Sequence, residues 1–254
     1  MTAAPTEVLR PGDIEHIERA TAAAVSPQAL EELDGWLLAF DSGTVNRAKS
    51  AVPLRHAPGD ARLLGAIEAR YAAHGLPPLF RLAADPCFDG FRRELVQRGY
   101  REDRPTRVQL ASTHTVRAVS TQAPAAISAS PDPAWAALFL GEGFDPVDGA
   151  NRVAALSRAP DALYASVVEG GQTVAAGAAV FSHGWAGVHG MRTDAACRGR
   201  GLAGRILAGL AEAALERGLP RIFLQVEAGN AAAQGLYRRA GFETAWSYAY
   251  WGKP

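Results

Sequence analysis

The sequence lacks an excess of charge of either sign, since 26 lysine and arginine residues balance 26 aspartate and glutamate residues. A balanced chain has no general basic field that would attract nucleic acid or an anionic membrane surface. No run approaches the roughly 18 consecutive apolar residues of a membrane-spanning helix. Residues 1–13 also lack the basic and then apolar order of a signal peptide. We therefore expect a soluble cytoplasmic protein without nucleic-acid or membrane partners.

Cysteine is also scarce, because the chain holds only Cys87 and Cys197, far apart in the sequence. Two distant cysteines form neither a disulfide framework nor a metal cluster. The six histidines show no pair at the spacing that places two ligands on one helix face. We therefore expect no metal. Apolar residues make up 48% of the chain, which is sufficient for a core.

Hydrophobic periodicity and turn residues predict alternating helices and strands in both halves of the chain. In the first half we expect, in order, a helix over 14–25, a short helix from residue 26, a hairpin of strands 35–40 and 44–54, a helix over 61–74, a strand over 79–83, a helix over 88–98 and a strand over 107–111. In the second half we expect a helix over 133–140, a hairpin of strands 162–169 and 173–181, a strand over 186–193, a helix over 202–217, a strand over 221–227, a helix over 230–240 and a strand over 244–251. This order predicts an α/β protein of the α+β type.

The second half repeats part of the first. Residues 61–82 resemble residues 204–225 without a gap, and residues 91–103 resemble residues 236–244. The segment 112–133 between the halves is rich in Ala, Ser, Thr and Pro, which is typical of a linker. We predict two related domains, residues 1–120 and 121–254, each with a mixed, mostly antiparallel sheet flanked by helices.

The stretch 198–204, RGRGLAG, lies between a predicted strand and a predicted helix. Glycine lets the backbone approach a ligand, and the free N–H groups of a first helical turn bind phosphate, assisted by arginine. In the first half the repeat places Pro58 and Asp60 in the corresponding stretch, 55–61. Proline removes a donor and aspartate repels an anion. The phosphate site is therefore expected only in the second half.

The same stretch also fits the dinucleotide-binding pattern G-x-G-x-x-G, with Glu227 at the end of the next strand. Three features weigh against this interpretation. Residues 194–198 make the turn before the first glycine too long, the preceding strands are joined by hairpins, and the chain after Gly204 is too short for a doubly wound sheet.

The sequence from Met191 onward resembles the GNAT superfamily of acetyl-CoA-dependent N-acetyltransferases. Arg198-x-x-Gly201-x-Ala203 matches the R/Q-x-x-G-x-G/A signature of that family, and Asn230, Tyr237 and the Gly241–Phe242 pair match its downstream element. The resemblance covers roughly residues 130–254, and the first half is similar only as a degenerate copy. The chain thus resembles tandem GNAT proteins, in which one copy is active. The segment 35–54 also looks like the N-terminal domain of a group of bacterial GNAT proteins.

The resemblance implies that acetyl-CoA binds between the strands 186–193 and 221–227. Backbone groups of the first strand would contact the pantetheine arm and polarise the thioester carbonyl as an oxyanion hole does. The first turn of the following helix would hold the pyrophosphate. The residues implied to bind the cosubstrate are Met191, Arg192, Thr193, Arg198, Gly199, Arg200, Gly201, Leu202, Ala203, Gly204, Asn230 and Tyr237.

Tyr237 falls where the family places a tyrosine near the sulfur, so we expect it to protonate the departing thiolate; a packed aromatic is the alternative. Asn230 also suits a helix N-cap. The base stays open. His189 lies beside the predicted acetyl site and titrates in a suitable range, Glu227 and His183 are further candidates, and a water chain is another alternative.

The function expected from these features is transfer of acetyl from acetyl-CoA to a small-molecule or peptide amine by direct attack. The alternatives are a sensor that binds acyl-CoA without turnover and a structural dimerisation platform. The aromatic segment 245–251 fits an acceptor pocket, an interface or simply a half-buried strand. The acceptor and the acyl-chain preference stay open, and we expect a monomer or a homodimer.

Overall fold

The computed structural model describes residues 9–141, 143 and 145–254. Residues 1–8, which belong to the segment where the sequence predicts no targeting signal, lie outside the described residues. Within the described part of the chain, no helix is long and apolar enough to cross a membrane. The same part contains no group of three or more His, Cys, Asp or Glu side chains arranged to hold a metal ion.

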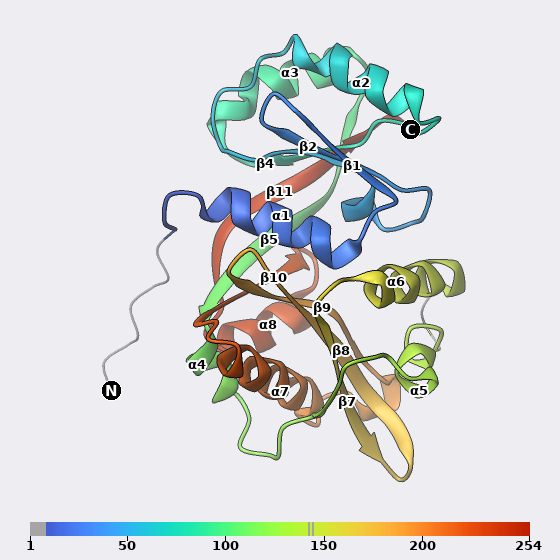
Figure 1. Cartoon of the computed structure of the whole chain (residues 1–254), viewed down its shortest axis with the longest axis vertical. Coiled ribbons are helices and arrows are strands. Elements are labelled where there is room, and N and C mark those ends of the chain that lie inside the picture. Colours follow the sequence, from blue (N-terminus) through green and yellow to red (C-terminus); the bar gives the residue numbers. More distant parts are fainter. Residues whose placement is uncertain (1–8, 142, 144) are drawn as a thin grey trace.

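The described part of the first half alternates strands with α-helices and short 3-10 helices (Figure 1). Its elements follow in the order α1 (Asp13–Val25), β1 (Ala29–Leu33), β2 (Trp36–Phe40), the 3-10 helix η1 (Asn46–Ala48), β3 (Ala51–Pro53), α2 (Leu63–Ala73), β4 (Phe80–Ala83), η2 (Pro86–Phe88), α3 (Asp89–Gln97) and β5 (Arg101–Ser112).

The segment between the halves is not a plain linker, because it contains a short helix and a short strand. The remaining elements are α4 (Thr113–Arg117), β6 (Ala126–Ser128), α5 (Pro133–Ala137), α6 (Pro146–Arg158), β7 (Ala162–Glu169), β8 (Gln172–Ser182), β9 (Trp185–Thr193), η3 (Ala195–Cys197), α7 (Leu202–Glu216), β10 (Arg221–Glu227), α8 (Ala231–Arg239) and β11 (Glu243–Gly252).

The eleven strands of the described residues form one continuous sheet, in the order β1-β2-β3-β4-β11-β5-β10-β9-β8-β7-β6. Only β3 with β4 and β9 with β10 pair in parallel among the described strands; the other pairs are antiparallel. The predicted mixed, mostly antiparallel sheet flanked by helices is therefore confirmed, although the two predicted sheets are joined into one.

The two halves exchange their last strands. β5, the last strand of the first half, pairs with β10 of the second half, and β11, the last strand of the chain, pairs with β4. The exchanged strands also pair with each other, antiparallel. In Figure 1, β11 and β5 run together through the centre of the molecule and connect its upper and lower parts. The predicted boundary at residue 120 stays a prediction, because chain order does not divide this sheet into two.

The internal repeat is visible in the backbone. Gly75 and Gly218, which end α2 and α7, have φ of 68° and 69°, and Gly99 and Gly241, which end α3 and α8, have φ of 85° and 84°. Each glycine allows the next residue to close the same hydrogen bond back to the helix: Leu76 to Tyr71, Leu219 to Ala214, Tyr100 to Leu95 and Phe242 to Tyr237. Equivalent helices thus end in the same way. Apart from the extra edge strand β6, the strands follow in the same order from either edge of the sheet to its centre.

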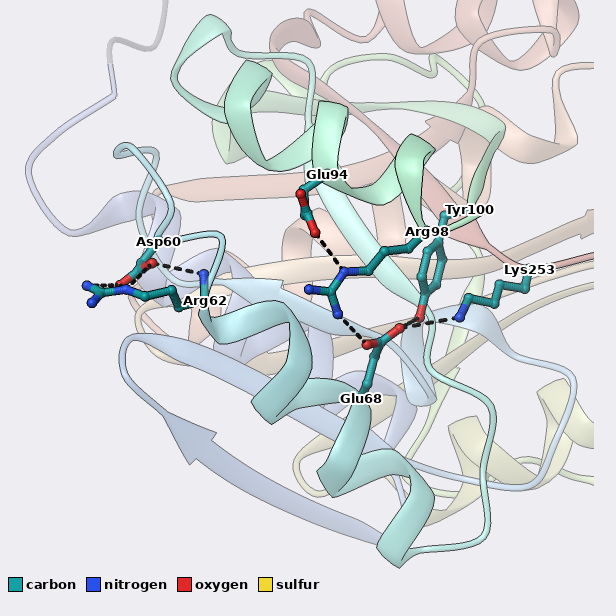
Figure 2. Close-up of polar contacts among 7 residues, drawn as sticks. All are labelled: Asp60, Arg62, Glu68, Glu94, Arg98, Tyr100 and Lys253. Atoms are coloured by element: carbon teal, nitrogen blue, oxygen red, sulfur yellow. Dashed lines mark hydrogen bonds and ion pairs between the residues drawn. The ribbon is translucent and has the colours of Figure 1, made fainter.

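Polar contacts hold the chain's C-terminal end on the first half (Figure 2). Glu68 on α2 accepts hydrogen bonds from Tyr100 and Arg98, both at 2.8 Å, and Lys253 beyond β11 lies 3.4 Å from the same carboxylate. Ion pairs this exposed contribute about 0–1 kcal/mol each. These contacts orient the end of the exchanged strand β11 but add little to its stability. Most of its stabilisation comes from burial of aromatic side chains in the apolar core of the first half: Trp246, Tyr248, Tyr250 and Trp251.

Helices cover both faces of the second half of the sheet. α7 contacts β7, β8 and β9, and Ala186 and Val188 of β9 lie in its apolar core. α1 contacts β8 and β9 from the opposite face, where Trp185 and Phe223 lie in the core of the first half. Side chains alternate between the two faces of a strand. One face of β9 is therefore covered by α7 of the second half, and the other face by α1 of the first half.

A buried ion pair fastens α1 to β10. Asp13 accepts hydrogen bonds of 2.8 and 2.7 Å from the two terminal nitrogens of Arg221, and the two residues are 5% and 7% exposed. Burial alone would raise the pKa of the Asp13 carboxyl, but the hydrogen bonds from Arg221 and from the backbone of Arg10 lower it overall. The ionised carboxylate therefore stabilises the folded chain.

Asp13→Asn is expected to lower the free energy of unfolding by about 1.5–3 kcal/mol at neutral pH, the range for hydrogen bonds to charged groups. A lowered folded pKa gives stability that is present above the unfolded pKa of about 3.9 and is lost as the pH falls through the folded value. The difference between wild type and variant in urea unfolding should therefore shrink below about pH 4. A difference that stays constant with pH would contradict this role.

Two sequence-based predictions of local structure were wrong. The short helix expected from residue 26 is the strand β1, which pairs with β2 along its whole length. The strand expected over 44–54 is split into η1 and β3, so only its second part pairs with β2. Helix α6 was not expected, although Asp145 caps it through a 2.8 Å hydrogen bond from the Asp148 N–H and Pro146 occupies its first turn.

Candidate active site

A gap opens in the sheet between β9 and β10. The two strands pair only over residues 186–188 and 222–224, although β9 continues to Thr193 and β10 to Glu227. Each strand keeps its other neighbour beyond that point, since β9 still pairs with β8 and β10 with β5. The backbone on both sides of the gap is thus held in place while the strands separate. A cleft of about 260 Å³ lies there, and Met191, Leu224 and Val226 are among its lining residues.

A β-bulge shapes the β9 side of the gap. Between the pairs Ala176–Arg192 and Ala178–His189, β8 contributes one residue and β9 contributes two, Gly190 and Met191. Gly190 has φ of 62°, and a Cβ there would lie 2.7 Å from Leu156. Only glycine meets both conditions, the left-handed backbone and the close packing. The bulge leaves backbone groups of this segment unpaired with β8 and next to the gap.

Tyr237 of α8 lines the cleft and is 7% exposed. Its ring packs edge-on against Phe242, with centroids 5.8 Å apart. Burial raises the pKa of the Tyr237 hydroxyl to about 12, and the opposing charge of Arg192 only partly offsets this effect. The phenol therefore stays protonated at neutral pH and can act as a proton donor.

His189 also lines the cleft and is 4% exposed. Within the described part of the chain, neither of its ring nitrogens has a hydrogen-bond partner. Burial, with a smaller contribution from the charge of Arg47, lowers its pKa to about 3. The imidazole is therefore neutral and can accept a hydrogen bond, but it is too weak a base to hold a proton.

The other two candidate bases differ in position. Glu227 lines the cleft at its exposed end, where β10 finishes. His183 lies in the turn between β8 and β9, at the end of β9 remote from the gap, with its Nδ1 2.6 Å from the Ser182 hydroxyl. The structure thus brings His189 and Glu227 to the cleft but not His183.

Asn230 begins α8 and lines the cleft. Its side-chain oxygen accepts a 3.1 Å hydrogen bond from the backbone N–H of Ala233, so it serves as the N-cap of this helix. The cap anchors the start of the helix that carries Tyr237. The predicted N-cap role is therefore confirmed.

The predicted phosphate-binding stretch, residues 198–204, follows β9 and η3 and lies beyond the walls of the cleft. Gly199 and Gly201 have φ of 78° and 81°, and no side chain in the described residues caps the start of α7 at Gly201. Arg200 is paired with Glu169 at 2.8 Å, and Arg205 donates to the carbonyl of Ala123 at 2.7 Å. Two of the nearby arginines thus already have protein partners.

The equivalent stretch of the first half is built differently. Asp60, before α2, accepts a 2.9 Å hydrogen bond from the backbone N–H of Arg62 and is also paired with the Arg62 guanidinium (Figure 2). An aspartate of the chain itself therefore occupies backbone and arginine donors at this helix start. In α7 the corresponding position is Ala203, which offers no such acceptor.

Several residues of the cleft were missed from the sequence. The first half contributes Asn46 and Arg47 through η1 and Thr44 just before it, in a segment that was expected to be a strand. Further cleft residues that were not predicted are Arg104, Thr106, Arg152 and Gln225. A signal existed for Gln225, which interrupts the apolar strand β10, and for Tyr248 and Tyr250, which belong to the aromatic segment already considered for a pocket.

A family model described as "Probable histone acetyltransferase Rv0428c C-terminal" matches residues 11–251, nearly the whole chain. The chain belongs to this family of GNAT N-acetyltransferases. The predicted superfamily is confirmed, and with it the prediction of an acyltransferase enzyme.

Relatives agree with this assignment. The GNAT chain is 26% identical over 239 residues to the "Uncharacterized N-acetyltransferase YobR" of Bacillus subtilis, covering 91% of this chain and 94% of that protein. Its fold is similar to a GCN5-related N-acetyltransferase from Kribbella flavida, with a TM-score of 0.72 at 21% identity, over 96% of this chain and 97% of the other.

A tandem GNAT protein from the clavulanic acid biosynthesis pathway is also similar in fold. The TM-score is 0.59 at 12% identity, and the match covers 95% of both chains. A similarity over the full length of a tandem protein agrees with the duplicated GNAT architecture described above.

Proposed function

We propose that this GNAT protein transfers the acetyl group of acetyl-CoA to a primary amine of a small molecule or peptide by direct attack. The observation that carries this proposal is the gap between β9 and β10, with the bulge at Gly190 on one side and Tyr237 on the other. A thioester placed there would have backbone donors on one side and a protonated phenol on the other. An amine could approach it through the same cleft.

Two parts of the chain would hold the cosubstrate. The start of α7, with Gly199 and Gly201 in left-handed conformations and no side-chain cap among the described residues, suits the pyrophosphate. Backbone groups of residues 191–193 would bind the pantetheine arm, with Asn230 across the gap. The contrast with α2, where Asp60 occupies the donors, supports binding in the second half. Acetyl-CoA supplies the activated acyl group.

Each proposed catalytic role follows from the protonation state of a side chain. Tyr237, protonated because its pKa is about 12, would donate its proton to the departing sulfur. Neutral His189 would accept a hydrogen bond from the attacking amine and orient it. Because the pKa of His189 is about 3, the proton lost by the amine would leave through water rather than remain on the imidazole.

Tyr237→Phe is expected to lower kcat by about 100-fold, the low end of the range for general acids, because a thiolate is already a fair leaving group. The release of CoA thiol under saturating acetyl-CoA measures the effect. Tyr71→Phe is a matched control, since it removes a buried hydroxyl that donates to the carbonyl of Ala39 in the first half. Activity of Tyr237→Phe within about twofold of wild type would exclude the tyrosine as the acid.

A sensor that binds acyl-CoA without turnover is the second candidate, favoured by the decayed first copy. Thiol release across a panel of amines discriminates the two functions, because a sensor would bind acetyl-CoA but release no thiol with any amine. The matching family model is described as a probable histone acetyltransferase. A lysine-rich peptide therefore belongs in the panel as a candidate acceptor. A cytoplasmic location and a monomeric or homodimeric state stay predictions.

A further inference from the structure

The cleft reaches the face of the sheet opposite α7. Along β10, Leu224 and Val226 belong to the apolar core below α7, whereas Phe223 belongs to the core of the first half. Because side chains alternate along a strand, Gln225 projects to the same face as Phe223. Residues of η1, α6 and β11 line the cleft on this side: Asn46, Arg47, Arg152, Tyr248 and Tyr250. We call these residues and Gln225 the acceptor wall. The start of α7, the proposed site of the donor's pyrophosphate, belongs to the other face of the sheet.

Arginine dominates the charge of the cleft. Among the described residues that line it, the four arginines Arg47, Arg104, Arg152 and Arg192 stand against a single carboxylate, Glu227 at the exposed end. Two of the arginines have carboxylate partners just outside the cleft, since Arg152 is bonded to Asp148 at 2.6 Å and Arg104 lies 3.2 Å from Asp103.

Arg47 differs from these two. It is partly buried, and its guanidinium donates a 3.3 Å hydrogen bond to the side-chain oxygen of Gln225, a neutral amide. In the part of the chain that the structure describes, Arg47 forms no ion pair within 4.0 Å; the charge of Glu18 interacts with it, but that carboxylate is paired with Arg81 at 2.6 Å. A half-buried guanidinium has lost part of its hydration, and a planar anion restores that interaction through paired hydrogen bonds.

A hydrogen-bond network positions Arg47. The Gln225 oxygen also accepts a 2.7 Å hydrogen bond from the Tyr248 hydroxyl, and the Gln225 nitrogen donates to Thr21 of α1 at 2.8 Å. Gln225 is therefore fixed from both sides before any ligand binds. Its orientation presents the oxygen to Arg47, so the guanidinium is preorganised at the acceptor wall.

We propose that the acceptor is a small amine that carries its own anionic group, in the simplest case a carboxylate, and that Arg47 binds this group. The inference rests on the proposed acetyl transfer. The phosphates of the donor are assigned to the start of α7 on the other face, so the anion at Arg47 comes from the acceptor. A lysine-rich peptide brings positive charge against the arginines of the cleft and is disfavoured.

The experiment compares each common L-amino acid with its α-carboxamide, and O-phosphoethanolamine with ethanolamine. The members of each pair differ mainly in the anionic group, so a phosphate and a carboxylate are tested separately. For at least one pair, kcat/KM for the anionic member is expected to exceed that of its partner by about 10- to 100-fold, the range for a charge-assisted hydrogen bond. Arg47→Met should remove this preference.

Arg93→Met is the matched control, because it removes an exposed arginine from α3 in the first half and should keep the preference. Equal kcat/KM within every pair, or an unchanged preference in Arg47→Met, would overturn the inference. A large loss of acetyl-CoA affinity in Arg47→Met would also overturn it, because Arg47 would then bind the donor. A lysine-rich peptide that is used better than every anionic amine has the same consequence.

Binding separates this inference from the proposed function. Calorimetry of N-acetyl amino acids and their carboxamides is performed on the complex with CoA, without any turnover. Tighter binding of the carboxylates, lost in Arg47→Met, would support the anion site even if no amine released thiol, in which case the proposed transfer would fail alone. Thiol release without any preference for anions would reject the acceptor class and keep the transfer.

Discussion

Gly201→Asp is expected to abolish the binding of acetyl-CoA, with a rise in Kd of more than about 100-fold, equivalent to the loss of two charge-assisted hydrogen bonds. Gly201 has φ of 81° and immediately precedes the first residue of α7. A carboxylate there would occupy N–H groups of the first turn and repel a phosphate. In the first half a carboxylate two positions further along the repeat, Asp60, already accepts from the backbone N–H of Arg62 near the start of α2.

Two controls separate charge from backbone strain. Gly201→Asn keeps the size and the tolerance of Asp for the left-handed region but removes the charge, so it should retain most of the affinity. Gly218→Asp places the same carboxylate on a left-handed glycine, φ 69°, at the other end of α7. Titration calorimetry with CoA measures all three variants. Unchanged CoA affinity in Gly201→Asp would refute the assignment of the phosphate site.

The features that the sequence predicted are local. Glycines after helices, apolar periodicity and the short G-x-G stretch are read from neighbouring residues, and they gave the positions of α2, α7 and α8 within a few residues. The repeat was also visible because it places glycine at equivalent left-handed positions, such as Gly75 and Gly218. The bulge at Gly190, by contrast, depends on its register with β8 and has no local signature.

Most features that the sequence did not predict are non-local. The exchange of β5 and β11 consists in each strand pairing with the other half of the chain. Equivalent strands of a repeat have similar hydrophobic patterns, so these patterns do not tell which half each strand joins. The strand β1 was mistaken for a helix because its identity comes from pairing with β2. Helix α6 was missed despite the Asp145–Pro146 cap at its start, a signal that was available.

The acceptor wall illustrates the same limit at the site. Gln225 and Tyr248 are far from Arg47 in sequence, and they meet only because η1 packs beside β10 and the exchanged strand β11. A motif search in the second half alone therefore finds the side of the cleft that we propose binds the donor, and misses the side contributed by the first half. The degenerate copy thus supplies part of the site.

Arg81→Met is expected to destabilise the chain by about 3–5 kcal/mol, the range for breaking a buried ion pair. Arg81 of β4 and Glu18 of α1 are both 2% exposed, and their side chains meet at 2.6 Å. Removal of the guanidinium leaves a buried carboxylate without its countercharge. The Arg81 guanidinium also lies 5.1 Å from the ring centre of Tyr248, so the substitution loosens the exchanged strand β11 as well.

A double substitution tests whether the loss comes from the unpaired charge. Glu18→Leu with Arg81→Met removes both charges, so it should cost less than Arg81→Met alone. The free energy of unfolding in urea measures both, and Arg117→Met, which breaks the exposed pair of Arg117 with Glu212, should cost no more than about 1 kcal/mol. If the double variant instead loses as much stability as Arg81→Met and Glu18→Leu lose together when each is measured alone, the two residues are not energetically coupled. The attachment of α1 to β4 would then come from apolar packing alone.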